Sequence, residues 1–208
     1  MERSGICYIV GAAPFTERIT LRDGDFLIAA DGGRDAILQR GMKPDLTVGD
    51  FDSGEAPGEN EEPFLRFPVA KDETDTALAV REGIKRGYAY FMLYGCVGSL
   101  DHTLANIQLL HGMAKAGLHG YLVGGGWVST VLTHGTMRFA PTGRVSVFSL
   151  ADVSKGVCIR GLEYPLKDAC LTSDTPLGVS NRGRGEAAEI GLNEGALFVT
   201  WESASEEM

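Results

Sequence analysis

The segment FLIAADGGRDAILQRGMKPDLTVGDFDS, residues 26–53, holds two short apolar runs on either side of a stretch with helical spacing. The runs FLIAA and LTV have the length of buried strands, and Gly41 closes the stretch between them as glycine commonly ends a helix. A strand, a helix and a second strand in this order are typical of parallel strands joined by a crossover helix. The segment therefore predicts an α/β fold.

The same alternation extends in both directions from this segment, as far as Val123. It predicts strands at residues 6–10, 26–30, 46–48, 64–67, 91–94 and 121–123, and helices at residues 34–40, 75–86 and 102–116. The second and third helices are also closed by glycines, Gly87 and Gly117. We predict an α/β domain over residues 1–134, with a mainly parallel sheet and flanking helices.

The rest of the chain has a different pattern. Short apolar runs at residues 128–132, 145–150, 157–160, 187–190 and 197–200 are separated by Gly, Pro, Asn and Asp, and no helical spacing is found. Such a series is typical of a small antiparallel sandwich or barrel. We predict an all-β sandwich over residues 135–208, and interpret Gly124-Gly125-Gly126 as a turn between the two domains.

Composition excludes several classes of protein. With 208 residues, of which 44% are hydrophobic, the chain can bury a core, and a formal net charge of −9 argues against a nucleic acid partner. The opening MERSGICYIVGAAPF has too short an apolar run for a signal peptide or a membrane span, so we expect a cytoplasmic protein. The four cysteines form no C-x-x-C pair and are interpreted as reduced thiols.

Acidic residues follow the predicted parallel strands one after another. They are Asp31, Asp50 and Asp52, Asp72 and Asp75, and Asp101. Because the carboxyl ends of parallel strands share one edge of a sheet, these carboxylates are expected at a common rim, where a divalent cation would relieve their repulsion. Oxygen ligands alone favour Mg²⁺ over Ca²⁺ and imply a phosphate substrate. Any single Asp among them is more often a helix cap or a turn former.

Small and basic residues near this rim suit phosphate binding. Gly32 and Gly33 open a helix, and Gly98 follows the fifth strand, so backbone amides there can approach a phosphate. Lys71 is a cation next to Asp72, although a solvated loop lysine is an equally good interpretation. His102 and His134 are interpreted as structural.

Five motifs together resemble the thiamin pyrophosphokinase family. They are ADGG, PDLTVGDFDS, KDETD, GCVGSLDH followed by LANIQLL, and LGVSN, and they occur in the family's order from Asp31 to Asn181. GLEYPL, residues 161–166, is similar to a further stretch of the family's second domain. The resemblance implies an α/β domain followed by a β-sandwich, a homodimer, and transfer of the pyrophosphoryl group of ATP to thiamin with release of AMP.

The resemblance also implies roles for single residues. Asp50, Asp52 and Asp75 match the Mg²⁺ ligands, and Asp31, Asp72 and Asp101 are candidates for the catalytic carboxylates. The ATP-binding candidates are Gly32, Gly33, Lys71, Thr74, Gly98 and Ser99. Ser180 and Asn181 match the motif that recognises the aminopyrimidine ring of thiamin, although by themselves these two residues would predict only a turn. Trp201 is a candidate for an aromatic that stacks on thiamin, although both tryptophans are more often core residues.

Two departures from the family pattern stand out. Ser99 occupies a position where many members carry Arg, so Lys71 or Arg34 would have to supply the missing charge. Arg182 replaces a residue that is commonly acidic. Ser99 gives weight to a non-catalytic nucleotide or thiamin diphosphate sensor. A pyrophosphokinase for another small alcohol such as a hydroxymethylpterin also stays open, whereas a phosphatase with a nucleophilic aspartate in VGDFDS is weakened because no strand runs directly into a D-x-D core with a following Thr or Val.

Overall fold

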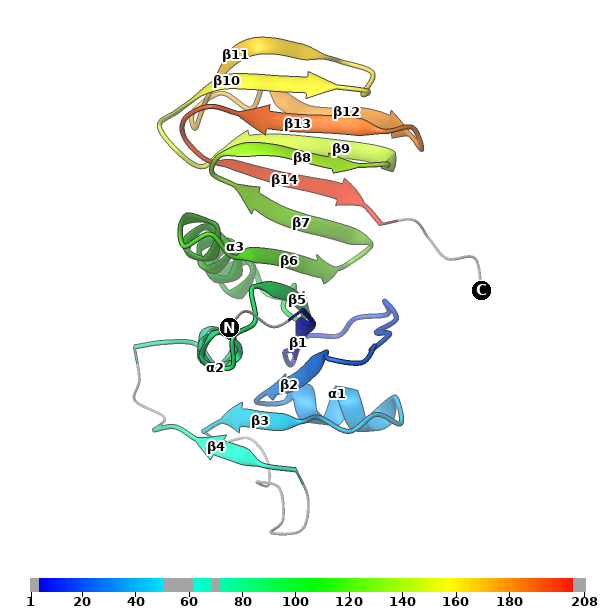
Figure 1. Cartoon of the computed structure of the whole chain (residues 1–208), viewed down its shortest axis with the longest axis vertical. Helices are drawn as coiled ribbons and strands as arrows, with labels where there is room; N and C mark the ends of the chain where they lie inside the picture. The colour runs from blue at the N-terminus through cyan, green and yellow to red at the C-terminus, as the bar shows by residue number, and fades with distance from the viewer. Residues whose placement is uncertain (1–3, 51–61, 69–71, 204–208) are drawn as a thin grey trace. The chain divides into compact units, whose positions relative to one another are not determined.

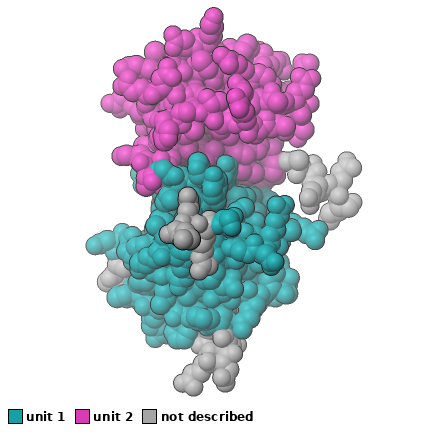
Figure 2. Space-filling view, in the orientation of Figure 1, with its two compact units in different colours: residues 1–109, 117–125 teal, residues 110–116, 126–208 magenta. Residues whose placement is uncertain are grey.

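The structure is a computed structural model that describes residues 4–50, 62–68 and 72–203. The chain divides into two compact units (Figure 1, Figure 2). The first comprises residues 1–109 and 117–125, and the second comprises residues 110–116 and 126–208. The domain boundary predicted after residue 134 lies C-terminal to the change of unit between residues 125 and 126.

A parallel sheet forms the centre of the first unit. Its strands are β1 (Ile6–Val10), β2 (Phe26–Ala30), β3 (Leu46–Gly49), β4 (Phe64–Arg66), β5 (Tyr90–Tyr94) and β6 (His119–Gly124). Every pairing between them is parallel. The central strands are apolar on both faces: Ile9 and Ile28 are fully buried on one face, and Val10 and Leu27 are fully buried on the other, as in strands covered on both sides.

The order of these strands is β6-β5-β1-β2-β3-β4. From β1 the chain builds outward through β2, β3 and β4, and then returns to the other side of β1 to add β5 and β6. The order therefore reverses between β1 and β5. In an open α/β sheet, the loops that follow the two strands at such a point diverge and leave a crevice at their carboxyl ends.

In the described part of the chain, three helices connect the strands: α1 (Gly33–Gln39), α2 (Asp75–Lys85) and α3 (Leu100–Lys115). The helices predicted at residues 34–40, 75–86 and 102–116 are confirmed to within two residues at each end. The three glycines expected to follow them all have positive φ, between 69° and 89°. Helix α2 packs closely on β1 and β5, since a Cβ on Gly83 would lie 2.8 Å from the Cys7 Sγ and 2.6 Å from the Phe91 ring.

Antiparallel strands make up most of the second unit. They are β7 (Trp127–Leu132), β8 (Gly135–Phe139), β9 (Thr142–Ser149), β10 (Val153–Arg160), β11 (Leu166–Thr172), β12 (Gly178–Arg184), β13 (Ala188–Leu192) and β14 (Leu197–Glu202). They pair in the orders β12-β9-β14-β7 and β11-β10-β13-β8. Buried residues of both sets, among them Val147 and Val199 from the first and Ile159 and Ile190 from the second, form one hydrophobic cluster.

The expectation of a mixed α/β chain with a large sheet and few helices is confirmed. Three strands that the sequence did not predict are β8, β11 and β12, and each lies at the end of its strand order. Edge strands bury few side chains, so their sequences, such as GVSNRGR in β12, lack the alternation of apolar and polar residues. The turn that Ser180 and Asn181 would predict by themselves is wrong, because both lie in β12. Ser180 has a φ of 61°, and the pairing with β9 shifts register between Gly178 and Asn181.

Candidate active site

A cavity of about 510 Å³ lies in the first unit at the point where the strand order reverses. It is lined by the loop after β1 (residues 11–14), by Ala30 and Asp31 after β2, by Thr74, Asp75 and Thr76 at the start of α2, and by Gly95, Cys96, Gly98, Ser99, His102 and Asn106. The cavity is thus built from the carboxyl ends of β1, β2 and β5, which is where a doubly wound sheet binds its ligand.

Two glycines bring the loops after β1 and β5 together. A Cβ on Gly11 would lie 2.6 Å from the Gly95 carbonyl oxygen, and a Cβ on Gly95 would lie 2.4 Å from the Gly11 carbonyl oxygen. The Gly11 N–H donates to the Tyr94 carbonyl at 2.8 Å, and the Ala13 N–H donates to the Gly95 carbonyl at 2.9 Å. No larger residue fits at either glycine, so this part of the cavity wall is backbone, as a site that accepts a phosphate chain requires.

Asp31 reaches the cavity through an uncommon backbone conformation. Its φ is 49°, and its N–H donates to the Val48 carbonyl at 2.7 Å. A Cβ on Gly49 would lie 3.4 Å from the Asp31 Oδ1, so the side chain turns toward the end of β3. Positive φ in a non-glycine residue is seldom found outside functional or tightly constrained positions.

The first turn of α2 supplies a second carboxylate to the same cavity. Thr74 is the N-cap, and its Oγ1 accepts a hydrogen bond from the Ala77 N–H at 3.2 Å. Asp75 follows as the first helical residue, half-buried, and lines the cavity together with Thr74 and Thr76. Two of the predicted acidic residues, Asp31 and Asp75, are therefore brought to one cavity from different elements.

The segment between β5 and α3 forms a polar edge of the cavity. The Ser99 Oγ lies 2.9 Å from the His102 Nδ1, and Ser99 and His102 both line the cavity. Asp101 points to solvent, with 78% of its side chain exposed, and its Oδ1 lies 3.4 Å from the same His102 nitrogen. Hydrogen bonds from the Ser99 hydroxyl and the His102 backbone lower the pKa of Asp101 below its ordinary value. His102, which was interpreted as structural from sequence, therefore belongs to this site. Its position three residues after Ser99 was the feature of the sequence that could have identified it as a site residue.

Two buried side chains close the floor of the cavity. Burial raises the pKa of the Cys96 thiol to about 11, so this thiol is protonated at neutral pH and is no nucleophile. The Asn106 Nδ2 donates to the Cys96 carbonyl at 2.8 Å, which ties α3 to the loop after β5. Neither residue was a site candidate from sequence, because each lines the cavity only once the loops after β1 and β5 have come together.

Other predicted residues lie elsewhere or outside the described chain. Asp50 follows β3 and is half-buried, and Asp72 is exposed; neither is among the residues that line the cavity. Gly32 and Gly33 do not line it either: Gly33 is buried, and a Cβ there would lie 1.8 Å from the Val10 carbonyl oxygen. Asp52 and Lys71 lie outside the described residues.

Arg34, suggested from sequence as a substitute for the missing Arg at position 99, binds a buried carboxylate. Its Nε donates to Glu62, which is only 4% exposed and also accepts a hydrogen bond from the Thr47 Oγ1 at 3.0 Å. Burial opposes ionisation of Glu62, but the hydrogen bonds from Arg34 and Thr47 outweigh it, so the pKa of this carboxyl lies below its ordinary value.

Glu62→Gln should therefore lower the free energy of unfolding at pH 7 by about 2–3 kcal/mol, because Arg34 loses its buried anion. Ionised Glu62 stabilises the fold above its unfolded-state pKa, and this stabilisation is lost as the pH falls through the lower folded-state pKa. The difference in free energy of unfolding between variant and wild type should thus become smaller as the pH falls. Urea unfolding over a pH series measures this difference. Glu194→Gln, which breaks an exposed pair with Lys155, is the control and should change little. A gap that stays constant with pH would contradict this role.

Ser180 lies at a separate cavity of about 600 Å³ within the second unit. Its other lining residues are Gly143, Glu163, Tyr164, Arg182, Gly183 and Arg184. The Ser180 N–H donates to the Ser146 Oγ at 3.1 Å, which holds the residue in its positive-φ conformation. Asn181 is buried, 5% exposed, and is not among the lining residues.

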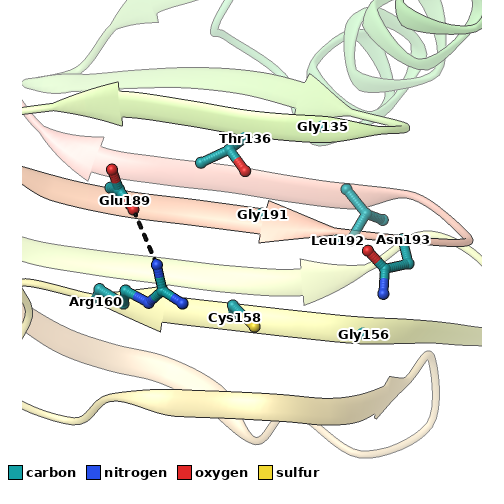
Figure 3. Close-up of a pocket in the computed structure, with 9 residues that line it drawn as sticks. All are labelled: Gly135, Thr136, Gly156, Cys158, Arg160, Glu189, Gly191, Leu192 and Asn193. Atoms are coloured by element: carbon teal, nitrogen blue, oxygen red, sulfur yellow. Dashed lines mark ion pairs between the residues drawn. The ribbon is translucent and has the colours of Figure 1, made fainter.

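A third cavity, of about 370 Å³, lies over strands β8, β10 and β13 of the second unit (Figure 3). Gly135, Gly156 and Gly191 leave its floor without side chains, and Arg160 is paired with Glu189 at 3.5 Å. No residue predicted from sequence lies here.

Two acidic residues of the described chain line the cavity and could contribute to a Mg²⁺ site. Within residues 4–50, 62–68 and 72–203, no group of three or more His, Cys, Asp or Glu side chains is arranged to hold a metal. Asp31 and Asp75 nevertheless both line the cavity, and Mg²⁺ is commonly held by one or two carboxylates together with substrate phosphates and water. The oxygen donors present fit that mode of binding.

Two family models match the chain, one over most of the first unit and one over most of the second. Residues 20–122 match the model of the thiamin pyrophosphokinase catalytic domain, and residues 137–197 match the model of the thiamin pyrophosphokinase vitamin B1 binding domain. The chain belongs to the thiamin pyrophosphokinase family. The two matched domains assign it that family's activity, the transfer of a pyrophosphoryl group from ATP to thiamin. They give no support to a pterin substrate or to a non-catalytic sensor.

Solved structures share the fold of this thiamin pyrophosphokinase family member. The Bacillus subtilis thiamine pyrophosphokinase matches with a TM-score of 0.85 at 21% identity, over 95% of this chain and 99% of that chain. The Geobacillus thermodenitrificans enzyme matches with a TM-score of 0.84 at 24% identity, over 98% and 100%. The yeast enzyme matches with a TM-score of 0.70 at 12% identity, over 98% and 87%. No curated protein gave a match. None of the helices in the described residues has the length and apolarity needed to cross a membrane.

Proposed function

We propose that the cavity at the reversal point of the parallel sheet binds the polyphosphate of ATP. Three features support this assignment: the cavity lies at the carboxyl ends of β1, β2 and β5, its wall at Gly11 and Gly95 is backbone, and its lining residues from Ala30 onward lie in the segment that matches the catalytic domain. Three of the predicted ATP-binding residues line it: Thr74, Gly98 and Ser99.

Mg²⁺ is proposed as the metal of this site. Asp31 and Asp75 would hold it from the cavity wall, with Asp50 and Asp52 as the further candidates from sequence. When bound, the ion would neutralise phosphate charge during the transfer. Asp31 is proposed to contribute through its fixed backbone, which keeps its carboxylate at the cavity without rearrangement.

The reaction forms a bond between the hydroxyl oxygen of thiamin and the β phosphorus of ATP, and breaks the bond between that phosphorus and the oxygen that bridges it to the α phosphate, so AMP leaves. The hydroxyl proton passes to a nearby base, for which Asp72 and Asp101 remain the candidates. Asp101 has a lowered pKa and is ionised at neutral pH, as an acceptor must be. Ser99 and His102 provide hydrogen-bonding groups at the cavity. Ser99 occupies the position where arginine is common in the family.

The observation that carries this proposal is the meeting of Asp31, Asp75, Gly98 and Ser99 at one cavity of the catalytic domain. Purified protein with ATP, Mg²⁺ and thiamin should release AMP and form thiamin diphosphate in equal amounts, and EDTA should abolish the release. A hydroxymethylpterin in place of thiamin should give only the background rate of ATP hydrolysis. AMP release that is independent of thiamin, or that is faster with the pterin, would contradict the proposal.

Three further expectations are proposed alongside this function. The single hydrophobic cluster shared by both strand sets of the second unit supports a β-sandwich there. The homodimer and the cytoplasmic location stay predictions. Analytical ultracentrifugation would test the homodimer.

A further inference from the structure

The connection between β1 and β2 is an irregular crossover. Parallel strands are usually joined through a helix, whose own hydrogen bonds fix its backbone. In the described chain, residues 11–25 join these two strands and form neither helix nor strand. Because this connection has no hydrogen-bond ladder of its own, contacts with other elements must hold it in place.

Phe15 anchors the part of this connection that lines the cavity. Its side chain is buried, and its ring packs against the ring of Tyr94 at the end of β5, with centroids 5.6 Å apart. Phe15 directly follows residues 11–14, which form one wall of the cavity. The position of this wall therefore depends on the position of Phe15.

Arg40, the C-cap residue of α1, holds both the ring and the backbone of Phe15. Its guanidinium carbon lies 3.9 Å from the centroid of the Phe15 ring, and its Nη2 donates to the Phe15 carbonyl. Its Nη1 donates to the Ala36 carbonyl at 3.0 Å, which fixes the guanidinium on the helix. An arginine at the end of a helix commonly binds carbonyls of that helix. The two contacts with Phe15 go beyond this role, because they tie α1 to the crossover.

We propose that Arg40 is a positioning residue of the nucleotide site, which keeps residues 11–14 in the arrangement that accepts ATP by holding Phe15. This inference rests on the proposed function of the cavity. Arg40 is exposed and is not among the residues that line the cavity, so its effect on ATP passes through Phe15. Because the side chain is exposed, its removal leaves no cavity in the core.

Removal of the guanidinium tests the proposal through the two KM values and kcat. Arg40→Ala should raise KM for ATP about fivefold, because fewer molecules then hold the loop in place and the apparent affinity falls by that fraction. The value of kcat should stay within about twofold of wild type, because saturating ATP selects the competent arrangement again. KM for thiamin should not change, because the segment that matches the vitamin B1 binding domain begins at residue 137. An unchanged KM for ATP would overturn the proposal.

A conservative variant and a double-mutant cycle test whether the effect passes through Phe15. Arg40→Lys keeps the charge, but its single nitrogen cannot make all the contacts of the guanidinium, so its KM for ATP should lie between those of wild type and Arg40→Ala. Phe15→Leu removes the ring and keeps an apolar side chain in the core. In that background Arg40→Ala should raise KM for ATP less than it does in the wild-type background. Independent, multiplying effects would overturn the role of Phe15.

The matched control is Arg86→Ala, which removes the same kinds of contact at another place in the first unit. Arg86 is the C-cap residue of α2, its guanidinium carbon lies 5.4 Å from the centroid of the Phe26 ring, and its Nη1 donates to the Glu82 carbonyl at 2.9 Å. None of these three residues lines the cavity.

Arg86→Ala should lower Tm at least as much as Arg40→Ala, because it also removes an ion-pair partner of the buried Glu82 carboxylate. It should nevertheless leave KM for ATP unchanged. An equal rise of this KM in both variants would mean that lost stability causes it, and would overturn the proposal.

Calorimetric titration of ATP with Mg²⁺ into wild type and Arg40→Ala, without thiamin, gives the same comparison without turnover. Wild-type protein that releases no AMP with thiamin would contradict the proposed function and, with it, this inference. Active wild type combined with a wild-type KM for ATP in Arg40→Ala would contradict this inference alone.

Discussion

Replacing Asp75 with asparagine should lower kcat for pyrophosphoryl transfer at least a hundredfold, which corresponds to about 2.7 kcal/mol or more of lost transition-state stabilisation. Asp75 lines the cavity with Asp31, and its carboxylate is a predicted metal ligand, so the amide removes a charge that the phosphates and Mg²⁺ require. The helix should be unaffected, because Thr74 rather than Asp75 is its N-cap. The measurement is AMP release at saturating ATP and thiamin over a series of Mg²⁺ concentrations.

The matched control for this variant is Asp35→Asn. Asp35 occupies the first turn of α1 as Asp75 occupies the first turn of α2, but it is exposed and does not line the cavity. It should retain wild-type activity and an unchanged unfolding temperature. Wild-type kcat in Asp75→Asn, with an unchanged dependence on Mg²⁺, would remove Asp75 from the metal site.

Replacing Leu197 with alanine should destabilise the protein by about 3 kcal/mol and lower its Tm by roughly 6–12 °C. Leu197 is fully buried in β14, which pairs with both β7 and β9, and its side chain belongs to the cluster shared by the two strand sets. Its truncation leaves a cavity that a β-sheet cannot collapse around easily. Differential scanning calorimetry measures the shift.

Leu177→Ala is the same chemical change at a side chain that is 62% exposed, and it should shift Tm by less than about 2 °C. Equal shifts for the two variants would mean that Leu197 is not part of a packed core. A large decrease in Tm for Leu197→Ala alone would support the shared core on which the proposed sandwich depends.

The positions of the central strands in the first unit followed from the residues because these strands are almost completely buried. Strands such as β1 and β2 are continuous apolar runs, and they occur at the residues predicted for them, 6–10 and 26–30. The three edge strands of the second unit were missed for the opposite reason. β11, with the sequence LKDACLT, buries only Leu171 of its seven residues, so its composition does not distinguish it from a loop.

The candidate site was predicted in part. Asp31, Thr74, Asp75, Gly98 and Ser99 were candidates from sequence, and all of them line one cavity. His102 was interpreted as structural, and Cys96 and Asn106 were not candidates, although all three line the cavity. The family resemblance assigned Asn181 to thiamin, but its side chain forms hydrogen bonds with the Tyr164 backbone. A residue type at a motif position indicates that the position matters. Whether its side chain faces a ligand or the protein depends on hydrogen bonds made by residues far away in the chain.

From the residues alone follow the α/β order of elements, the succession of acids after strands, and the family, because apolar runs, terminating glycines and motif spacing are local properties of the chain. Tertiary structure alone decides that β5 returns to the far side of β1, since a buried strand's composition records that it is covered and not which strand lies beside it. That choice of neighbour opens the crevice between the two loops, and so creates the cavity to which Asp31 and Asp75 are brought.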